Sequence, residues 1–233
     1  MSNPVTDAVR AALAARADPA RAAQQQRYMK SEMPFHGLAT PERRAALRPV
    51  WAAYAPTGTD DWRATIADLW DTAARREERY AAIELLRLPR FRAWASVPDP
   101  ATIALLRHMI VTGAWWDYVD EIATHPVGDL LRTAPATMTP VLRGWAHEPD
   151  LWLRRTAIIA QLHARERTDL ALLAEAIGAS AADPDFFARK AIGWALRQHA
   201  RTDPAWVRAF VADHPELAPL SRREALSRLG DPA

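Results

Sequence analysis

Apolar residues recur at intervals of three and four along almost the whole chain, which places them on one face of an α-helix. No segment shows the convincing alternation of apolar and polar residues that is typical of a strand. The pattern predicts an all-α protein of about a dozen helices joined by short loops. The predicted helices cover residues 7–17, 19–31, 41–54, 60–72, 77–88, 100–112, 115–133, 149–164, 170–177, 184–200, 204–212 and 221–229.

Several predicted helices begin with a polar residue followed by proline, which caps the first N–H groups and suits the first helical turn. These pairs are Thr40-Pro41, Asp99-Pro100, Asp183-Pro184 and Asp203-Pro204. The eight glycines and 18 prolines also favour helices punctuated by proline over hairpins closed by glycine. With 233 residues, the chain lies within the size range of one domain with its own core. We therefore expect a single domain over residues 1–233.

The sequence also repeats itself. The segment from Asp150 to Ala157 resembles the segment that begins at Asp185, 35 positions later, and the same step backwards from Asp150 reaches the segment from Trp115 to Asp120. Asp120, Arg155 and Lys190 then occupy equivalent positions in three successive units. A repeat of this length with two helices per unit is typical of an α-solenoid. Because the tetratricopeptide pattern is missing, we expect a right-handed α-α superhelix of HEAT-like helix pairs.

In such a superhelix the second helix of each pair lines the concave side, so we expect Asp120, Arg155 and Lys190 to face a groove. Hydrophobic residues make up 49% and charged residues 25% of the chain, as in ordinary globular proteins. The formal charge is only +2, but nearly all cations are arginine, which favours contacts with phosphate or carboxylate. An anionic partner is indicated.

Several classes of protein are excluded by what the composition lacks. Without cysteine there is no disulfide, no Cys-ligated zinc, no iron–sulfur cluster and no thiol nucleophile. Apolar runs are short and the N-terminus lacks the pattern of a signal peptide, so we expect a cytoplasmic protein without a membrane span. The seven histidines form no His-x-x-x-His pair, and the glycine motifs of nucleotide sites and of hydrolases are missing. We expect no metal and no cofactor.

The segment from Trp115 to Ile122 carries the first candidate chemistry. Trp116 and Asp120 are four residues apart and share one helix face, while Trp115 belongs to the opposite, core-facing stripe. An aromatic ring beside a carboxylate suits a cationic ligand, through cation–π attraction and a full opposite charge. The alternative is that Trp116 packs at the rim and Asp120 pairs with an arginine of the groove.

Two further segments carry basic residues. Arg154 and Arg155 lie about 100° apart on a helix, so only one can point straight into the groove, and the repeat register selects Arg155. Lys190, Trp194 and Arg197 follow at spacings of four and three on a single face. Basic residues interleaved with an aromatic ring suit a nucleic-acid backbone. The alternative is that these charges lie on solvated helix faces.

Six short blocks together resemble the DNA alkylation repair family, the AlkD-like DNA glycosylases built from HEAT-like repeats. They occur in family order between about Arg21 and Leu229. The blocks are Tyr28-Met29-Lys30, Thr40-Pro41-Glu42-Arg43-Arg44, Trp115-Trp116-Asp117-x-Val119-Asp120, Trp152-Leu153-Arg154-Arg155-Thr156-Ala157, Ala191-Ile192-Gly193-Trp194 and Leu220-Ser221-Arg222-Arg223-Glu224-Ala225.

The resemblance implies hydrolysis of the N-glycosidic bond of cationic N3- and N7-alkylated purines in double-stranded DNA, without a metal or cofactor. Trp116, Asp120 and Arg155 fall where the family's catalytic residues lie, with Arg155 expected to hold the phosphate beside the lesion. A groove that wraps duplex DNA is compatible with a monomer, which is the expected state. The positions expected to bind DNA are Tyr28, Lys30, Arg43, Arg154, Lys190, Trp194 and Arg197.

The chemistry agrees with a lone carboxylate, because an alkylated purine cation leaves as a neutral base and needs no general acid. Asp120 would stabilise the oxocarbenium ion that forms on the sugar. Two alternatives remain. One is a non-catalytic HEAT-repeat protein that binds damaged or branched DNA, which the presence of both Trp116 and Asp120 disfavours. The other is a protein scaffold that binds an acidic peptide, which leaves the aromatic–carboxylate pair unexplained.

Overall fold

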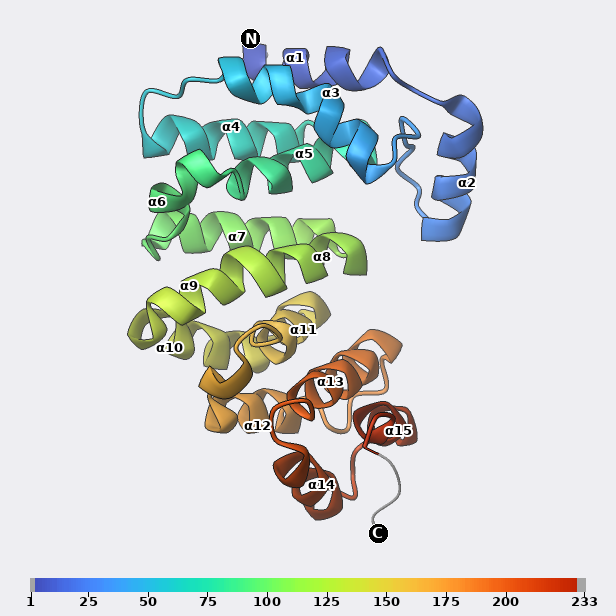
Figure 1. Ribbon diagram of the computed structural model, residues 1–233, viewed down its shortest axis with the longest axis vertical. Helices are drawn as coiled ribbons and strands as arrows, with labels where there is room; N and C mark the ends of the chain where they lie inside the picture. Colours follow the sequence, from blue (N-terminus) through green and yellow to red (C-terminus); the bar gives the residue numbers. More distant parts are fainter. Residues whose placement is uncertain (1–2, 230–233) are drawn as a thin grey trace. The chain divides into compact units, whose positions relative to one another are not determined.

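The computed structural model describes residues 3–229, and within that range the chain forms helices joined by short loops, with no strand (Figure 1). The predicted all-α class is confirmed. The chain divides into two compact units, one before and one after the junction of Trp94 and Ala95. The expectation of a single domain over residues 1–233 is not tested by this division and stays a prediction.

The N-terminal unit is built mainly from five α-helices, of which α1, α3, α4 and α5 share one core, while α2 buries Met29. Trp62 and Trp70 of α4 are fully buried there, together with Leu13 of α1 and Leu85 of α5. The short α6 crosses the junction of the units. The elements are α1 (Pro4–Ala14), α2 (Pro19–Met29), α3 (Thr40–Ala53), α4 (Thr59–Asp71), α5 (Arg76–Leu86), the 3-10 turn η1 (Pro89–Phe91) and α6 (Arg92–Ala95).

The C-terminal unit repeats pairs of helices. α8, α11, α13 and α15, which are the second helices of successive pairs, pack against one another in that order (Figure 1). The elements are α7 (Pro100–Gly113), α8 (Trp116–Ile122), the π-helical turn η2 (Ala123–Val127), α9 (Gly128–Thr133), α10 (Pro135–Ala146), α11 (Leu151–Ile159), the 3-10 turn η3 (Arg165–Arg167), α12 (Leu170–Gly178), α13 (Phe186–His199), α14 (Pro204–Asp213) and α15 (Pro219–Leu226).

This order agrees with the α-α repeat fold expected from the sequence. Asp120, Arg155 and Lys190 lie on α8, α11 and α13, so the three positions of the repeat register belong to successive, directly packed helices. The right-handed curvature and the concave groove stay predictions.

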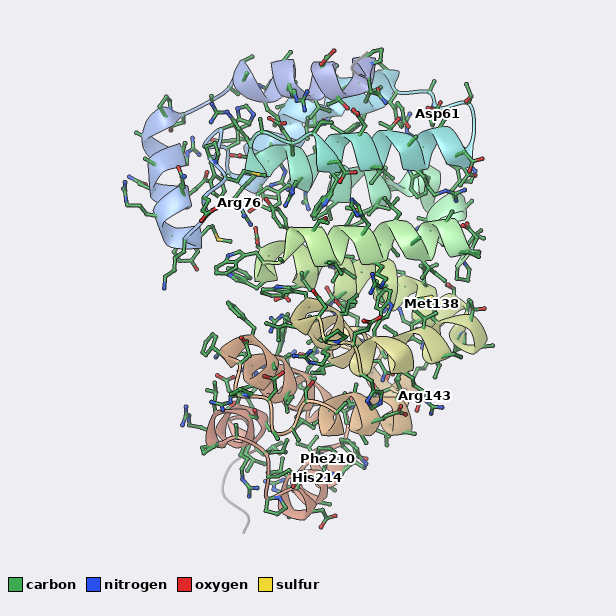
Figure 2. The ribbon with its side chains drawn as sticks, turned by 180° about the vertical axis from the view of Figure 1, so that it is seen from behind. Asp61, Arg76, Met138, Arg143, Phe210 and His214 are labelled. Atoms are coloured by element: carbon green, nitrogen blue, oxygen red, sulfur yellow. The ribbon has the colours of Figure 1, made fainter. Side chains whose placement is uncertain are left out.

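Two elements differ from the pattern-based expectation because of prolines. The helix predicted over 115–133 is interrupted by η2, since Pro126 has no N–H to donate within an α-helix. The sequence pattern also missed α10, whose Pro140 reads as a helix breaker. Its buried face carries Met138, labelled in Figure 2, while Arg143 on the same helix reaches Glu175 of α12, 3.0 Å away.

Two of the four predicted caps are confirmed and two are wrong. The side chains of Asp99 and Asp203 accept hydrogen bonds from the first N–H groups of α7 and α14. Thr40 is the first residue of α3 and not its cap, because the N-cap is Ala39. The cap of α13 is Asp185, while Asp183 forms an ion pair with Arg154.

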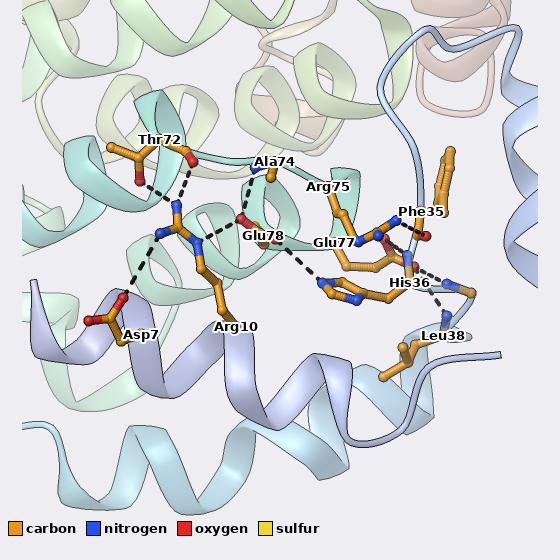
Figure 3. A network of polar contacts seen from close by, with 11 residues as sticks. Asp7, Arg10, Phe35, His36, Leu38, Thr72, Ala74, Arg75, Glu77 and Glu78 are labelled. Atoms are coloured by element: carbon orange, nitrogen blue, oxygen red, sulfur yellow. Dashed lines mark hydrogen bonds and ion pairs between the residues drawn. The ribbon is translucent and has the colours of Figure 1, made fainter. Parts of the chain in front are cut away.

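A buried carboxylate organises the loop before α3. Glu77 accepts hydrogen bonds from the backbone N–H groups of His36, Gly37 and Leu38, at 2.8, 2.8 and 3.1 Å (Figure 3). Gly37 has φ +92, and a Cβ there would come 2.1 Å from the carbonyl oxygen of Asp18. The turn therefore requires glycine.

The neighbouring Glu78 links α1 to α5. Its carboxylate accepts hydrogen bonds from Arg10 Nε and from the N–H of Ala74, and it lies 3.4 Å from His36 Nε2 (Figure 3). Burial alone would raise the pKa of Glu78, but these donors together hold that pKa below its ordinary value of 4.5. Arg76, labelled in Figure 2, is also buried and lies over the ring of Phe35.

Candidate active site

Asp120 and Arg155 form a two-point ion pair between α8 and α11. Arg155 Nε donates to Asp120 Oδ1 at 2.7 Å, and Nη2 donates to Oδ2 at 2.8 Å. The two side chains are only 6% (Arg155) and 17% (Asp120) exposed. Parallel donors matched to both carboxylate oxygens fix the orientation of the carboxylate as well as its position. The sequence left open that Asp120 pairs with an arginine, and the structure contains this ion pair.

A third helix completes this arrangement. Arg155 Nη1 donates to the backbone carbonyl of Phe187 on α13 at 2.7 Å, so one guanidinium joins α8, α11 and α13. The Phe187 ring packs against Trp152 and Trp115, with centroid distances of 5.1 and 5.4 Å. The cluster reaches the ion pair through Phe187, because the Arg155 guanidinium lies over this ring, 6.0 Å from its centroid. Beside it, Phe186 is 55% exposed.

Burial raises the pKa of the Asp120 carboxyl above its ordinary value of 3.8. The hydrogen bonds and positive charge of Arg155 offset part of that rise, and the nearby Asp117 adds to it. Arg155 therefore favours the ionised form of the Asp120 carboxyl, which burial disfavours.

Trp116 opens α8 and is half-buried, one turn before Asp120. The predicted sharing of one helix face follows from this placement on α8. Trp115 precedes the helix as its N-cap, is half-buried and packs in the aromatic cluster, while Val119 and Ile122 of the predicted core-facing stripe are fully buried.

The contacts of Arg154 and Arg155 differ. Arg154 donates to the carbonyl oxygens of Glu148 and Pro149 and pairs with Asp183 Oδ2 at 2.7 Å, so it ties α11 to the loops on either side. Arg155 uses three of its five N–H groups on Asp120 and Phe187. Both arginines therefore have structural roles in the protein, and their contacts with DNA stay predictions.

Lys190 and Arg197 share an acidic partner. Lys190 Nζ donates to Glu224 Oε1 at 2.7 Å, and Arg197 Nη1 donates to Glu224 Oε2, so α15 supplies one carboxylate to two cations of α13. Trp194 lies between them in sequence and is half-buried. The hydrogen bond from Lys190 and the charge of Arg197 hold the pKa of Glu224 below its ordinary value.

Three predicted DNA-binding residues belong to the N-terminal unit. Tyr28 on α2 is 78% exposed, and Lys30 caps that helix with a left-handed backbone, φ 49. Arg43 on α3 is 12% exposed, lies 3.8 Å from Glu84 and covers the ring of Tyr80. Burial lowers the pKa of Arg43, while Glu84 opposes that shift. Its role in DNA binding stays a prediction.

Comparison with known proteins identifies the family of the chain. Residues 9–229 match the model of a family described as DNA alkylation repair enzyme. The chain belongs to the DNA alkylation repair enzyme family. A solved structure titled "Predicted DNA alkylation repair enzyme from Enterococcus faecalis" is 27% identical, with a TM-score of 0.80 over 93% of this chain and 98% of the other. No curated protein matches the chain.

Membership of the DNA alkylation repair family confirms the resemblance seen in the sequence and makes DNA the implied partner. Within residues 3–229, no group of three or more His, Cys, Asp or Glu residues is arranged to hold a metal ion. No helix in the described part of the chain has the length and apolar content needed to cross a bilayer.

Sequence reasoning missed three groups that shape this site. Glu224 belongs to one of the blocks that resemble the family, but it lies 34 residues after Lys190, one short of the 35-residue step, so the repeat register does not select it. The Phe187 carbonyl carries no sequence signal, because any residue supplies a backbone oxygen. Asp183 was interpreted as a helix cap, and its pairing with Arg154 depends on the fold of the loop before α13.

Proposed function

We propose that this member of the DNA alkylation repair family is a monofunctional DNA glycosylase that removes cationic N3- and N7-alkylated purines from double-stranded DNA. The observation that carries the proposal is the oriented, partly buried carboxylate of Asp120, held by Arg155 beside an aromatic cluster. A carboxylate in this setting is suited to stabilising positive charge that develops on a bound sugar.

The substrate class follows from the pairing of Asp120 with a guanidinium instead of with a second carboxylic acid. Alkylation at N3 or N7 makes the purine a cation, so when the bond between C1′ and N9 breaks, its electron pair neutralises the departing ring. No proton has to be given to the base. Ordinary glycoside hydrolysis instead needs an acid and a second carboxylate. The single carboxylate of Asp120 matches the cationic substrate.

Asp120 acts on the other partner in the reaction, the sugar. As the glycosidic bond breaks, positive charge develops at C1′ and O4′ of the deoxyribose, and the carboxylate stabilises that oxocarbenium ion. The same carboxylate orients a water molecule, whose oxygen forms the new bond to C1′ and whose proton passes through Asp120 to solvent. Arg155 keeps the carboxylate ionised and aimed, and its two remaining N–H groups are left for the adjacent phosphate.

The aromatic residues supply the rest of the site. Trp116, one turn from Asp120, and Trp194 on α13 offer ring faces that attract a cationic base or an oxocarbenium-like sugar. Lys190 and Arg197 on α13 contact the phosphates of the duplex. Tyr28, Lys30 and Arg43 are further DNA-binding candidates in the N-terminal unit. The protein works in this proposal as a monomer without metal or cofactor.

The proposal is tested with a duplex that contains one N7-methylguanine. The wild-type protein should release the base and leave an abasic site, which alkali converts into a strand break. A duplex with hypoxanthine at the same place is the matched substrate control, because its uncharged base is a poor leaving group and should be released slowly or not at all. Tight binding of the alkylated duplex without base release would instead establish the non-catalytic DNA-binding alternative.

A further inference from the structure

Four charged residues form an ordered series on the second helices of the C-terminal unit. Asp120, Arg155 and Lys190 occupy equivalent positions on α8, α11 and α13, and Glu224 follows on α15. The ion pairs join the first two and the last two members of the series. The order along the helices is therefore acidic, basic, basic, acidic.

Glu224 differs from Asp120 in its surroundings. It bridges two cations, Lys190 and Arg197, and all three side chains keep contact with solvent, being 20% (Glu224), 40% (Lys190) and 30% (Arg197) exposed. Asp120 and Arg155 are considerably less exposed. The Glu224 cluster, defined as Lys190, Arg197 and Glu224, is thus accessible to a phosphate, whereas the Asp120 pair is largely covered.

The backbone is built to bring this carboxylate close. At Gly193, which lies on α13 between the two cations, an added Cβ would come 2.6 Å from Glu224 Cβ, so only glycine leaves room for the glutamate stem. Ser221, one turn earlier on α15, donates to the carbonyl oxygen of Arg189 at 2.9 Å and fixes α15 against α13. The position of Glu224 is therefore fixed by tight helix packing and does not depend on the ion pairs alone.

The charges of this cluster determine its effect on DNA. Two cations and one carboxylate give a net charge of +1, so the cluster attracts duplex DNA about as one isolated cation does. A phosphate that approaches either cation must compete with a carboxylate already held at hydrogen-bond distance. Phosphate contacts supply the sequence-independent part of DNA affinity, and each adds about 0.9 to the slope of log K against log[salt].

We propose that Glu224 is a positioning residue that holds Lys190 and Arg197 on either side of Trp194 and weakens their binding to DNA phosphate. The inference rests on the proposed DNA-binding function. Its consequence is that the protein holds undamaged duplex less tightly than two free cations would allow. A repair protein needs this property, because undamaged DNA is in vast excess over the lesion.

The test is the affinity of the full chain for undamaged duplex DNA, measured between 50 and 200 mM salt. Glu224→Gln keeps the size of the side chain and removes its charge, so both cations are freed for phosphate. We expect tighter binding at 50 mM salt and a slope steeper by about 0.9, so that the advantage over wild type shrinks by about 3.5-fold at 200 mM. Glu216→Gln is the control, since Glu216 is exposed and the described residues show no ion pair with it.

A slope for Glu224→Gln that equals those of wild type and Glu216→Gln overturns the inference. The proposed function fails separately, if the wild-type protein releases no N7-methylguanine. Should Glu224→Gln fail to fold, Lys190→Met, Arg197→Met and the double variant provide the same test. If Glu224 neutralises one cation, each single variant removes about 0.9 from the slope and the double variant removes little more. Independent cations would instead lose about 1.8 in the double variant, which contradicts the inference.

Discussion

Asp120 and Arg155 occupy equivalent positions of neighbouring repeats and bind each other through two hydrogen bonds, at 2.7 and 2.8 Å. In a repeat protein such positions lie on corresponding helices of adjacent repeats, which pack side by side, so opposite charges in register meet directly. The pair therefore links the architecture to the chemistry. The helix packing that builds the C-terminal unit also orients the carboxylate on which the proposed reaction depends.

Asp120→Asn tests the charge at the centre of the proposed mechanism. The amide keeps the shape of the side chain but no longer opposes the oxocarbenium ion. We expect a loss of about 10²–10³ in the single-turnover rate of N7-methylguanine release, about 2.7–4 kcal/mol, with little change in duplex affinity. The rate is measured with enzyme in excess over labelled duplex.

Asp129→Asn is the matched control for this variant. Asp129 is an exposed aspartate on α9 that forms an ion pair with Arg132. Its replacement by asparagine is therefore the same chemical change at a position away from the site. Its rate should remain close to that of wild type. An Asp120→Asn protein as fast as the control would show that the carboxylate does not stabilise the transition state.

Arg155→Met tests how the guanidinium keeps Asp120 ionised. Arg155 lowers the pKa of Asp120 against the rise caused by burial, so its removal should raise that pKa further. The rate follows the ionised fraction of Asp120. The acid limb of the pH–rate profile should therefore move to higher pH in Arg155→Met, after subtraction of spontaneous depurination. An acid limb at the wild-type position would contradict this role.

The same variant has a second readout in its stability. A buried carboxylate without its partner costs about 3–5 kcal/mol when ionised. A group whose pKa is raised in the folded state stabilises it at low pH and loses that contribution as the pH rises through the folded pKa. Urea unfolding should therefore show Arg155→Met far less stable than wild type at neutral pH, with a smaller difference in acid. A difference independent of pH would point to lost packing alone.

Much of the fold could be predicted because helix periodicity is a local property. The register of Asp120, Arg155 and Lys190 was also visible, since a repeat of 35 residues preserves it. The interruption at Pro126 and the helix around Pro140 were not predicted correctly. Proline removes a donor in both cases, and tertiary packing decides whether the helix turns, as at η2, or continues, as in α10.

The sequence predicted which residues belong to the candidate site but not which side chains they pair with. The sequence places Arg155 near Asp120, yet the bidentate pairing depends on the distance between α8 and α11, which no spacing rule supplies. Glu224 shows the same limit, because its contact with Lys190 requires the absent Cβ of Gly193. Charge partners between helices depend on backbone approach, so they emerge only from the packed structure.

Glu78→Gln should make the free energy of unfolding depend less on pH in the acidic range. The pKa of Glu78 is lowered in the folded state, so its contribution is present above the unfolded value of 4.5 and is lost as the pH falls through the folded pKa. We expect a loss of about 1.5–3 kcal/mol at neutral pH, since charge-assisted bonds are lost. The loss should shrink below about pH 4.5 in urea titrations. Glu216→Gln is the control, and an equal loss at all pH values would contradict the prediction.

Gly37→Ala tests whether the turn held by Glu77 requires glycine. An alanine at φ +92 is strained, and its Cβ would come 2.1 Å from the Asp18 carbonyl oxygen, which is backbone and cannot move aside cheaply. We expect a loss of at least about 2 kcal/mol in the free energy of unfolding. Gly144→Ala is the matched substitution, because Gly144 lies within α10 with open space around its Cβ position. It should stabilise the protein by about 0.5–1 kcal/mol through helix propensity. Opposite signs for the two substitutions in urea unfolding are the expected result, and a neutral Gly37→Ala would show that the loop shifts to accommodate a side chain.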